Sequence, residues 1–145
     1  MPVKPKPERY HTVTPYLMVK GVAKLLDFLK AAFDAEEIER NPGPDGTVMH
    51  AEVKIGDSIV MMGEATDKWQ PVPCSLYLYV DDTDAVYTRA VHAGATSVME
   101  PADMFYGDRN AGVKDASGNF WWIATHKEDV PAEEMQRRAE AHVRK

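Results

Sequence analysis

A histidine and a glutamate that stand two residues apart are the first side chains in this sequence with an evident chemical use. His50 and Glu52 lie in residues 47–55, where polar and apolar residues alternate. Residues two apart in a β-strand point to the same face, so these two side chains should lie together. Such a pair can move a proton or supply two ligands to a metal ion. A hydrogen-bonded pair on a hydrated strand face is the simpler interpretation.

Two more ionisable residues lie at the ends of predicted strands. Glu64 follows the run 58–63, and His126 follows the run 119–125. Carboxylate oxygens and imidazole nitrogens are good ligands for Zn, Mn and Fe. If the fold brought Glu64 and His126 close to the pair on residues 47–55, the four side chains would suit a divalent metal.

Arg109 and Cys74 each have a structural interpretation beside a functional one. The Arg109 guanidinium could bind a ligand carboxylate or phosphate through paired hydrogen bonds, or it could hold the local loop by pairing with Asp108 or Glu52. Cys74, the single cysteine, precedes an alternating apolar stretch, which predicts a core thiol and not a nucleophile. A single cysteine cannot form an intrachain disulfide, so we expect a cytoplasmic protein.

Composition and charge exclude several classes of partner. The 145 residues are 44% hydrophobic with a net charge of −6, which indicates one globular domain without the basic surface that binds nucleic acid. No apolar run approaches the ~20 residues of a membrane-spanning helix. Residues 1–9 contain no apolar core, so we expect a short mobile arm and not a signal peptide. We find no serine-hydrolase, phosphate-loop, dinucleotide or zinc-peptidase motif.

Strand-like and helix-like spacing alternate along the chain and predict the framework that positions these residues. In the first half, a helix is predicted over 22–33 and strands over 13–19, 36–40, 47–55 and 58–63. In the second half, we predict a helix over 83–93, strands over 75–80, 96–99 and 119–125, and a loop followed by a strand over 105–114. Residues 131–145 form a predicted terminal helix, either a solvated appendage or a dimer contact.

The two halves match at a spacing of about 60 residues. Residues 16–19 match 77–80, and the pairs 53–54 and 113–114 each precede a turn and a strand. Each half alone would leave a sheet edge open and one face partly uncovered. We therefore predict an α+β fold within one domain, residues 1–145. It consists of two βαβββ modules with curved mixed sheets around a cup (residues 10–65 and 74–127) and a C-terminal helix (residues 128–145).

Several segments resemble the vicinal oxygen chelate superfamily, which includes glyoxalase I, bleomycin-resistance proteins and extradiol dioxygenases, and its PhnB-like branch in particular. The segments are residues 14–17, 45–46, 50–52, 55–58, 106–109, 115–119 and 121–123. The family pattern has proline at Ala116. The resemblance implies an open cup, built within one chain or between the two chains of a homodimer.

The resemblance also identifies four positions at which superfamily enzymes hold a divalent metal, usually with two histidines and two glutamates. They fall on Thr14, Ser75 and Trp122 and near Met61 or Met62. None of these residues supplies an imidazole or a carboxylate, and Fe, Ni, Zn or Mn needs several such donors. We therefore expect no metal cofactor at these positions. A displaced divalent-metal site that uses the histidines and glutamates described above is the alternative.

Strand alternation places mainly aromatic side chains on the faces that the resemblance assigns to the cup. These faces carry Tyr16, Tyr77, Tyr79, Phe120 and Trp122, with His50, Glu52 and Arg109 as polar neighbours. The opposite faces carry Val13, Leu17, Val19, Leu76, Leu78, Val80, Trp121 and Ile123, which suit packing on helices. Aromatic rings stack on planar or cationic compounds. We predict a metal-free small-molecule-binding protein. The alternatives are a metal-dependent lyase, isomerase or dioxygenase, and a structural dimer without a ligand.

Overall fold

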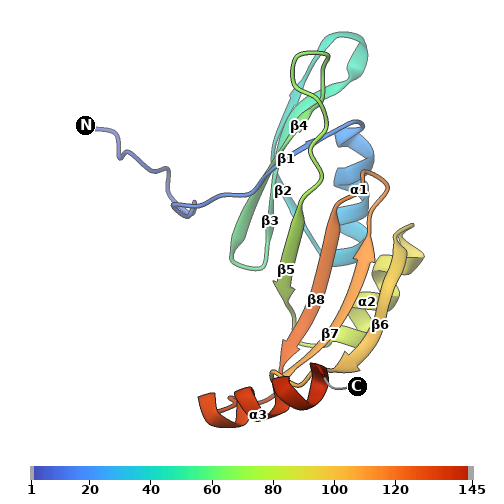
Figure 1. The fold of residues 1–145 in the computed structure, drawn as a ribbon. Helices are drawn as coiled ribbons and strands as arrows, with labels where there is room; N and C mark the ends of the chain where they lie inside the picture. The colour runs from blue at the N-terminus through green and yellow to red at the C-terminus, as the bar shows by residue number, and fades with distance from the viewer. Residues whose placement is uncertain (1, 144–145) are drawn as a thin grey trace.

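The computed structural model describes residues 2–143, which form two four-stranded sheets with a helix beside each (Figure 1). Module one contains β1 (Tyr16–Val19), α1 (Val22–Phe33), β2 (Glu36–Pro42), the 3-10 turn η1 (Pro44–Gly46), β3 (Val48–Ile55) and β4 (Ser58–Glu64). Module two contains β5 (Ser75–Tyr79), α2 (Thr83–His92), β6 (Thr96–Asp103), β7 (Asp108–Lys114) and β8 (Phe120–His126). The helix α3 (Ala132–Val143) follows. The predicted βαβββ order therefore occurs twice.

Both sheets have the same strand order, with the first strand of each module at one edge. The orders are β1-β4-β3-β2 and β5-β8-β7-β6, with β1–β4 and β5–β8 parallel and the other neighbours antiparallel. Among the described residues, no strand of one sheet pairs with a strand of the other. Val72 of the linker forms an isolated bridge with Met18. The fold is the predicted α+β architecture with two mixed sheets, and the sheets do not close on each other.

The two modules are joined through their helices. The apolar stripe of α1 is buried and repeats at helical spacing; it contains Val22, Leu25, Leu26, Leu29 and Phe33. α1 packs against α2 as well as against its own sheet (Figure 1). The ring of Phe33 lies 5.1 Å from that of the fully buried Trp121, and Arg89 of α2 forms an ion pair with Asp34 at 2.6 Å. Each sheet therefore turns one face away from the helices, which we call its open face.

The prediction of which side chains of each strand face the helices is mostly confirmed. The side chains of Leu17, Val19, Trp121 and Ile123 are buried, and those of Leu76, Leu78 and Val80 are partly buried against the same core. The prediction was wrong for Val13, which is 84% exposed. The strand was expected to begin at Val13, but β1 begins at Tyr16, so Val13 lies in the preceding segment and has no sheet to pack on.

The edge strand β6 is longer than predicted. It was expected to end at Met99 but continues to Asp103, with shifts of register on either side of Met99. Pro101 lies within this strand, a position that an edge strand tolerates because one side of its backbone makes no ladder bonds. Bulges and a proline therefore interrupt a strand whose irregular sequence had suggested an earlier end.

The terminal helix α3 is held by polar contacts. None of its described residues is buried. Its Arg138 donates to the carbonyl oxygen of Phe105 at 3.2 Å and pairs with Glu128 at 2.6 Å, and the ring of His142 lies 5.0 Å from that of Phe105. The predicted helix included residues 144–145, which lie outside the described part of the chain. None of the described helices combines the length and the apolar character that crossing a membrane would require.

The turn between β7 and β8 is built around a buried carboxylate. Asp115 accepts hydrogen bonds from the backbone N–H groups of Ser117 (2.9 Å) and Asn119 (3.0 Å). It also accepts one from Nε1 of Trp121 at 2.8 Å. The buried Asn119 accepts the backbone N–H of Cys74 at 2.9 Å, and Cys74 is partly buried against the core, as predicted. This network ties the linker between the modules to the start of β8.

We expect Asp115→Ala to lower the free energy of unfolding by about 3 kcal/mol, because it leaves several buried donors without an acceptor. Urea denaturation followed by circular dichroism measures the change. Asp57→Ala, at the exposed turn between β3 and β4, is the matched control and should change stability by no more than about 0.5 kcal/mol. Equal effects of the two substitutions would contradict a structural role for the buried network.

Candidate functional site

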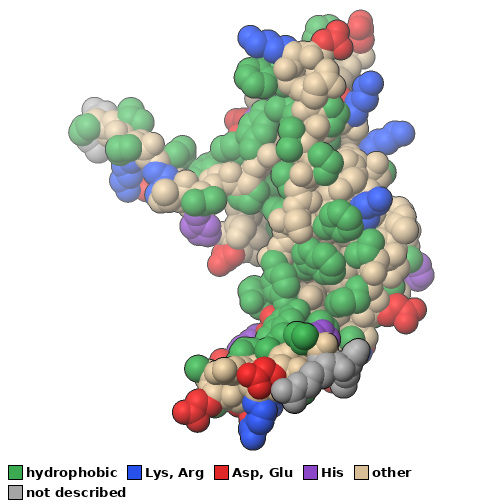
Figure 2. Space-filling model, viewed as in Figure 1, with side chains coloured by type: hydrophobic (Ala, Val, Ile, Leu, Met, Phe, Trp, Pro, Cys, Tyr) green, Lys and Arg blue, Asp and Glu red, His purple; other side chains and the backbone are tan. Residues whose placement is uncertain are grey.

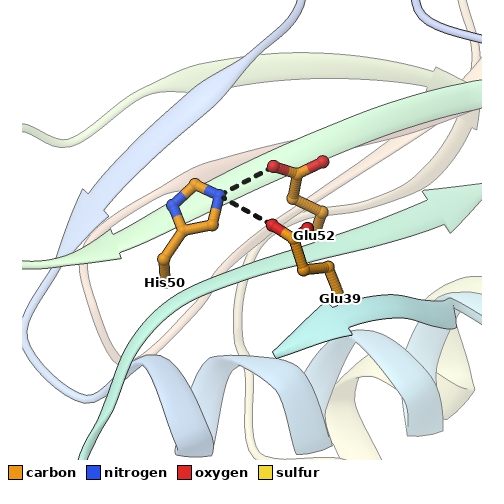
Figure 3. Close-up of side chains that lie close together, drawn as sticks. All are labelled: Glu39, His50 and Glu52. Carbon is orange, nitrogen blue, oxygen red and sulfur yellow. Dashed lines mark hydrogen bonds and ion pairs between the residues drawn. The ribbon is translucent and has the colours of Figure 1, made fainter. Parts of the chain in front are cut away.

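The open face of the first sheet carries a cluster of one histidine and two glutamates (Figure 3). His50 and Glu52 lie on β3, and Glu39 lies on the neighbouring β2. The Nε2 atom of His50 lies 2.7 Å from Oε2 of Glu52 and 3.8 Å from Oε2 of Glu39. The expected proximity of His50 and Glu52 is confirmed, and Glu39 is a member that the sequence pattern did not reveal.

A β-bulge brings Glu39 onto this face. The register of β2 against β3 shifts between Glu37 and Glu39, so these residues point to opposite sides of the sheet although they are two apart. Glu37 forms an ion pair with Lys30 of α1 at 2.8 Å. Glu39 lies directly across from Glu52 in the ladder. Strict alternation would have placed both Glu37 and Glu39 on the helix side.

Two tyrosines contact the outer sides of the cluster. Tyr10, in the segment before β1, donates its hydroxyl hydrogen to Oε1 of Glu52. The hydroxyl of Tyr16 lies 3.5 Å from Nδ1 of His50. Tyr16 reaches β3 across β4 at Gly63, where a Cβ atom would lie 2.5 Å from the tyrosine hydroxyl oxygen. Glycine at this position therefore lets the ring cross the sheet.

The surroundings of Glu52 favour its ionised form. Burial, which leaves the residue 7% exposed, opposes ionisation, but hydrogen bonds from His50 and Tyr10 outweigh it and hold the pKa of Glu52 below its ordinary value. The same hydrogen bond raises the pKa of Tyr10 to about 12, because the carboxylate holds the phenolic proton. Tyr10 therefore acts as a neutral donor.

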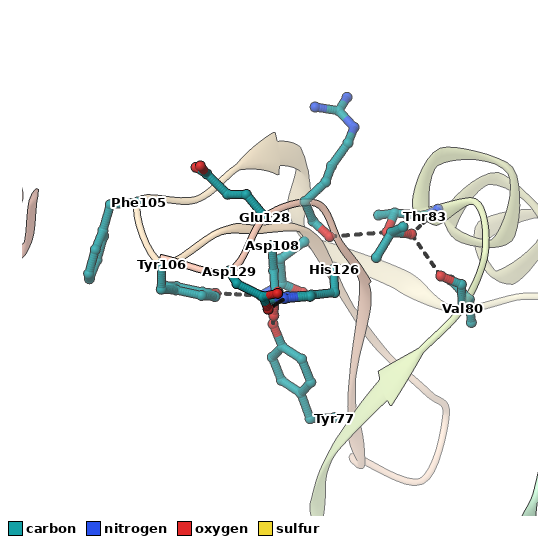
Figure 4. Close-up of polar contacts among 12 residues, drawn as sticks. Tyr77, Val80, Thr83, Phe105, Tyr106, Asp108, His126, Glu128 and Asp129 are labelled. Atoms are coloured by element: carbon teal, nitrogen blue, oxygen red, sulfur yellow. Dashed lines mark hydrogen bonds and ion pairs between the residues drawn. The ribbon is translucent and has the colours of Figure 1, made fainter. Parts of the chain in front are cut away.

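The second sheet carries a related cluster on its open face, where β7 begins and β8 ends (Figure 4). Asp108, at the start of β7, accepts the hydroxyl hydrogen of Tyr77 at 2.8 Å and contacts Nδ1 of His126 at 2.8 Å. Nε2 of His126 lies 2.7 Å from Asp129, which follows β8. Tyr77 and Tyr16 occupy equivalent positions in the repeat, so each module uses the tyrosine of its first strand to reach an acidic or histidine partner.

Burial and charge shift two pKa values in this second cluster. Asp108 is 6% exposed. Burial and the hydrogen bond to Asp108 both raise the pKa of Tyr77. The pKa of His126 is also raised, because hydrogen bonds to Asp108 and then to Asp129 favour the imidazolium form. The neighbouring Asn110 donates to the hydroxyl of Tyr106 at 3.1 Å.

The four side chains of the expected displaced metal site do not come together. Glu64 accepts the backbone N–H groups of Gly21 and Val22 at 2.9 and 3.0 Å, at the start of α1. Thr125 makes the equivalent contact in module two and accepts the N–H of Thr83 at 3.1 Å. Glu64 therefore satisfies free donors at a helix N-terminus, while His126 belongs to the second cluster described above. Only His50 and Glu52 of the predicted four are neighbours.

Arg109 points toward α2 and not toward either expected partner. Its Nε atom lies 2.7 Å from Asp84 of α2, and its Nη1 atom lies 3.2 Å from Asp103. The predicted pairing with Asp108 or Glu52 was wrong, because alternation along β7 turns Arg109 to the opposite side from Asp108. Arg109 thus links β7 and β6 to the first turn of α2.

The four positions where the superfamily holds a metal do not fit one in this chain. The Nε1 atom of Trp122 donates to Oγ of Ser75 at 2.9 Å, so two of these positions are occupied by a hydrogen bond between neutral groups. The hydroxyl of Thr14 donates to the carbonyl oxygen of His11 at 2.9 Å. Met61 and Met62 offer thioether sulfur, which is a soft and weak ligand. The donor set lacks the imidazoles and carboxylates that a divalent metal requires.

Beside these positions, the second sheet presents a set of aromatic rings. Phe120 and Trp122 are stacked, with ring centroids 6.2 Å apart. Tyr77 and Tyr79 lie 5.3 Å apart and are 41% and 67% exposed. Figure 2 shows hydrophobic side chains gathered over this part of the molecule. A groove of about 1010 Å³, lined by both modules, runs along β5.

Fold and site together define a class of protein with two βαβββ modules, open sheet faces and polar clusters beside exposed rings. The family model described as "Glyoxalase/Bleomycin resistance protein/Dioxygenase superfamily" matches residues 9–123. The chain therefore belongs to this superfamily.

Relatives and solved structures agree with this assignment. Uncharacterized proteins of Mycobacterium bovis and Mycobacterium tuberculosis are each 34% identical over 135 residues, which covers 86% of this chain and 89% and 79% of theirs. The crystal structure of TioX from Micromonospora has a TM-score of 0.70 at 24% identity and covers 80% of this chain and 98% of its own. A PhnB protein from Bacillus cereus has a TM-score of 0.62 at 19% identity, with 79% and 99% covered. At these identities the two structures show a shared fold.

We expect NMR titration to give His126 a pKa above its ordinary value of 6.5, and Asp129→Asn to lower it. Because folding raises the pKa of His126, the stabilisation that its protonated ring gains from its partners is complete below the pKa of the unfolded state. It is lost as pH rises through the pKa of the folded state. Asp129→Asn should therefore destabilise the protein more below about pH 6 than above about pH 8.

Asp67→Asn, in the exposed linker, should leave the titration of His126 unchanged. If Asp129→Asn did not move the pKa of His126, the contact between the two side chains would not exist in solution.

Proposed function

We propose that the protein binds a small planar compound, aromatic or cationic, on the aromatic open face of its second sheet. The observation that carries this proposal is the set of rings beside the hydrogen bond between Trp122 and Ser75, with exposed tyrosines on β5 and partly buried rings on β8. Aromatic rings supply large contact areas and attract cations to their faces. Because that hydrogen bond occupies two of the positions that the family resemblance assigns to metal ligands, the proposed binding uses no metal there, as in a bleomycin-resistance type of protein.

Charge on the open faces supports a cationic ligand. Asp108 lies beneath Tyr77 on the second sheet, and Glu39 and Glu52 lie on the first. Arg109, the cation of the predicted binding set, is paired with Asp84 and Asp103 and faces the helix side. Lys114 already places a cation 6.0 Å from the centre of the Phe120 ring. The negative charge that favours a cationic ligand therefore lies at the Tyr77 end of the rings, beside Asp108, and the whole chain carries −6. We propose Tyr16, His50 and Glu52 as the polar side of the same cup.

The cup is proposed to form between two copies of the chain. Three observations support this arrangement. The described side-chain contacts of the two open-face clusters stay within their own modules. The strands β1 and β5 lie at sheet edges and do not pair with each other. The groove along β5 is open and lined by both modules. A second copy would bring an open face opposite each of these surfaces. A cytoplasmic location, proposed from the single cysteine, is compatible with such a homodimer.

Calorimetric titration with N-methylquinolinium, in the presence of a metal chelator, tests ligand binding. We expect binding by the wild type and about tenfold weaker binding by Tyr79→Ala, which corresponds to a loss of about 1.4 kcal/mol from one cation–ring contact. The uncharged isostere 2-methylquinoline should bind more weakly than the cation.

Trp69→Ala is the matched control, since Trp69 is also an exposed aromatic residue but lies in the linker. It should bind the cation as the wild type does. Equal affinity of Tyr79→Ala and the wild type, or no binding of any planar cation, would refute the aromatic face as the binding surface.

Sedimentation equilibrium tests the assembly. We expect a mass about twice that of the 145-residue chain, because the open faces gain a partner only in the dimer. A single-chain mass at every concentration tested would show that the cup does not form between copies.

A further inference from the structure

The cluster on β2 and β3 places two carboxylates in a position that a sheet normally avoids. Glu39 and Glu52 are directly opposite each other in the antiparallel ladder, and like charges in directly opposed positions are destabilising. The bulge after Glu37 is what creates this opposition. Bulges often re-aim a side chain next to a functional site. The repulsion would be relieved by a positive charge held between the two glutamates.

The three donor atoms lie close enough together to share one metal ion after small side-chain movements. One ligand atom from each of Glu39, His50 and Glu52 lies within 4.8 Å of the others. A Zn²⁺ ion with bonds of about 2.0–2.2 Å holds its donors roughly 3.3–3.6 Å apart. The 2.7 and 3.8 Å separations from Nε2 of His50 fall on either side of this range. Glu39 is half exposed, so an ion can reach the site from solvent.

The remaining atoms of two of these side chains have partners of their own, as ligands of a metal usually do. Tyr10 binds Oε1 of Glu52, which leaves Oε2 directed at His50. Tyr16 lies beside Nδ1 of His50, which leaves Nε2 directed at the glutamates. Oε2 of Glu39, the oxygen that faces His50, also accepts a long hydrogen bond from Nδ2 of Asn41 at 3.4 Å, which a bound ion would replace. The cluster therefore presents one nitrogen and two oxygens to a common point, and Tyr10 and Tyr16 are positioning residues.

The second module shows that composition alone does not produce such a site. His126 also contacts two carboxylates, but Asp108 lies at Nδ1 and Asp129 at Nε2, on opposite sides of the ring. Those donors do not converge on one point. Within residues 2–143, only the cluster of module one brings three potential ligands together.

We infer that Glu39, His50 and Glu52 bind a first-row divalent cation of the Zn²⁺ or Mn²⁺ class on the open face of the first sheet. An imidazole nitrogen and two carboxylates form a donor set that binds such ions in preference to Mg²⁺. The site is separate from the four positions where the superfamily holds its metal, none of which it uses. It also does not depend on the proposed ligand binding, which is measured with a chelator present.

The experiment is calorimetric titration of chelator-treated, dialysed full-length protein with zinc chloride. We expect one Zn²⁺ per chain, with at least tenfold weaker binding by Glu39→Gln and by His50→Asn. Both replaced side chains are at least partly exposed, and circular dichroism confirms that the variants fold. The matched controls are Glu36→Gln, on the same strand, and His92→Asn, on the exposed face of α2. Both controls should bind as the wild type does.

Cobalt substitution supplies a second measurement that does not depend on heat or activity. Co²⁺ bound by one nitrogen and two oxygens gives a visible absorption band that His50→Asn should change or abolish, and Tyr10→Phe should weaken Co²⁺ binding less than Glu39→Gln does. No Zn²⁺ binding by the wild type, unchanged binding by Glu39→Gln, or equal affinity for Mg²⁺ would each overturn the assignment.

Discussion

The packing of α1 against α2 is the interaction on which the rest of the structure depends. Because the apolar stripe of α1 and the indole of Trp121 are buried at this helix–helix contact, both sheets pack their aliphatic faces against the helices. The opposite faces are then left with tyrosines, tryptophan, histidines and acids. The division between a packing side and an open side is thus set by the core. The same division explains why Tyr16 and Tyr77, at equivalent positions, both point away from the helices.

Much of this arrangement follows from local periodicity. An unbroken strand predicts that His50 and Glu52 share a face, and helical spacing predicts the buried stripe of α1. The repeat at about 60 residues predicts that the second half copies the first. These inferences succeed because each depends only on residues that are neighbours within one regular element. The resemblance of the sequence to the superfamily, which the family model confirms, then supplied the way in which the elements assemble.

What could not be predicted depends on departures from regularity or on contacts between distant elements. The bulge in β2 reverses the direction of Glu39, and no residue pattern marks it. Glu64 lies at a strand end, as expected, but its carboxylate accepts the first N–H groups of α1, which only the tertiary fold brings near. Arg109 found its partner on α2 for the same reason. Tyr10 precedes the sheet altogether, so alternation says nothing about it.

The two outer strands, β2 and β6, have a consequence for how copies of this chain can associate. Both are interrupted by bulges, and prolines lie at Pro42 and Pro101. Irregular, proline-containing edges are poor templates for adding another strand. Growth of either sheet outward into an open-ended polymer is therefore disfavoured. The proposed two-fold pairing would use the inner margins instead, where such a pairing closes and stops. An acidic protein with exposed rings is in this way protected from outward strand addition.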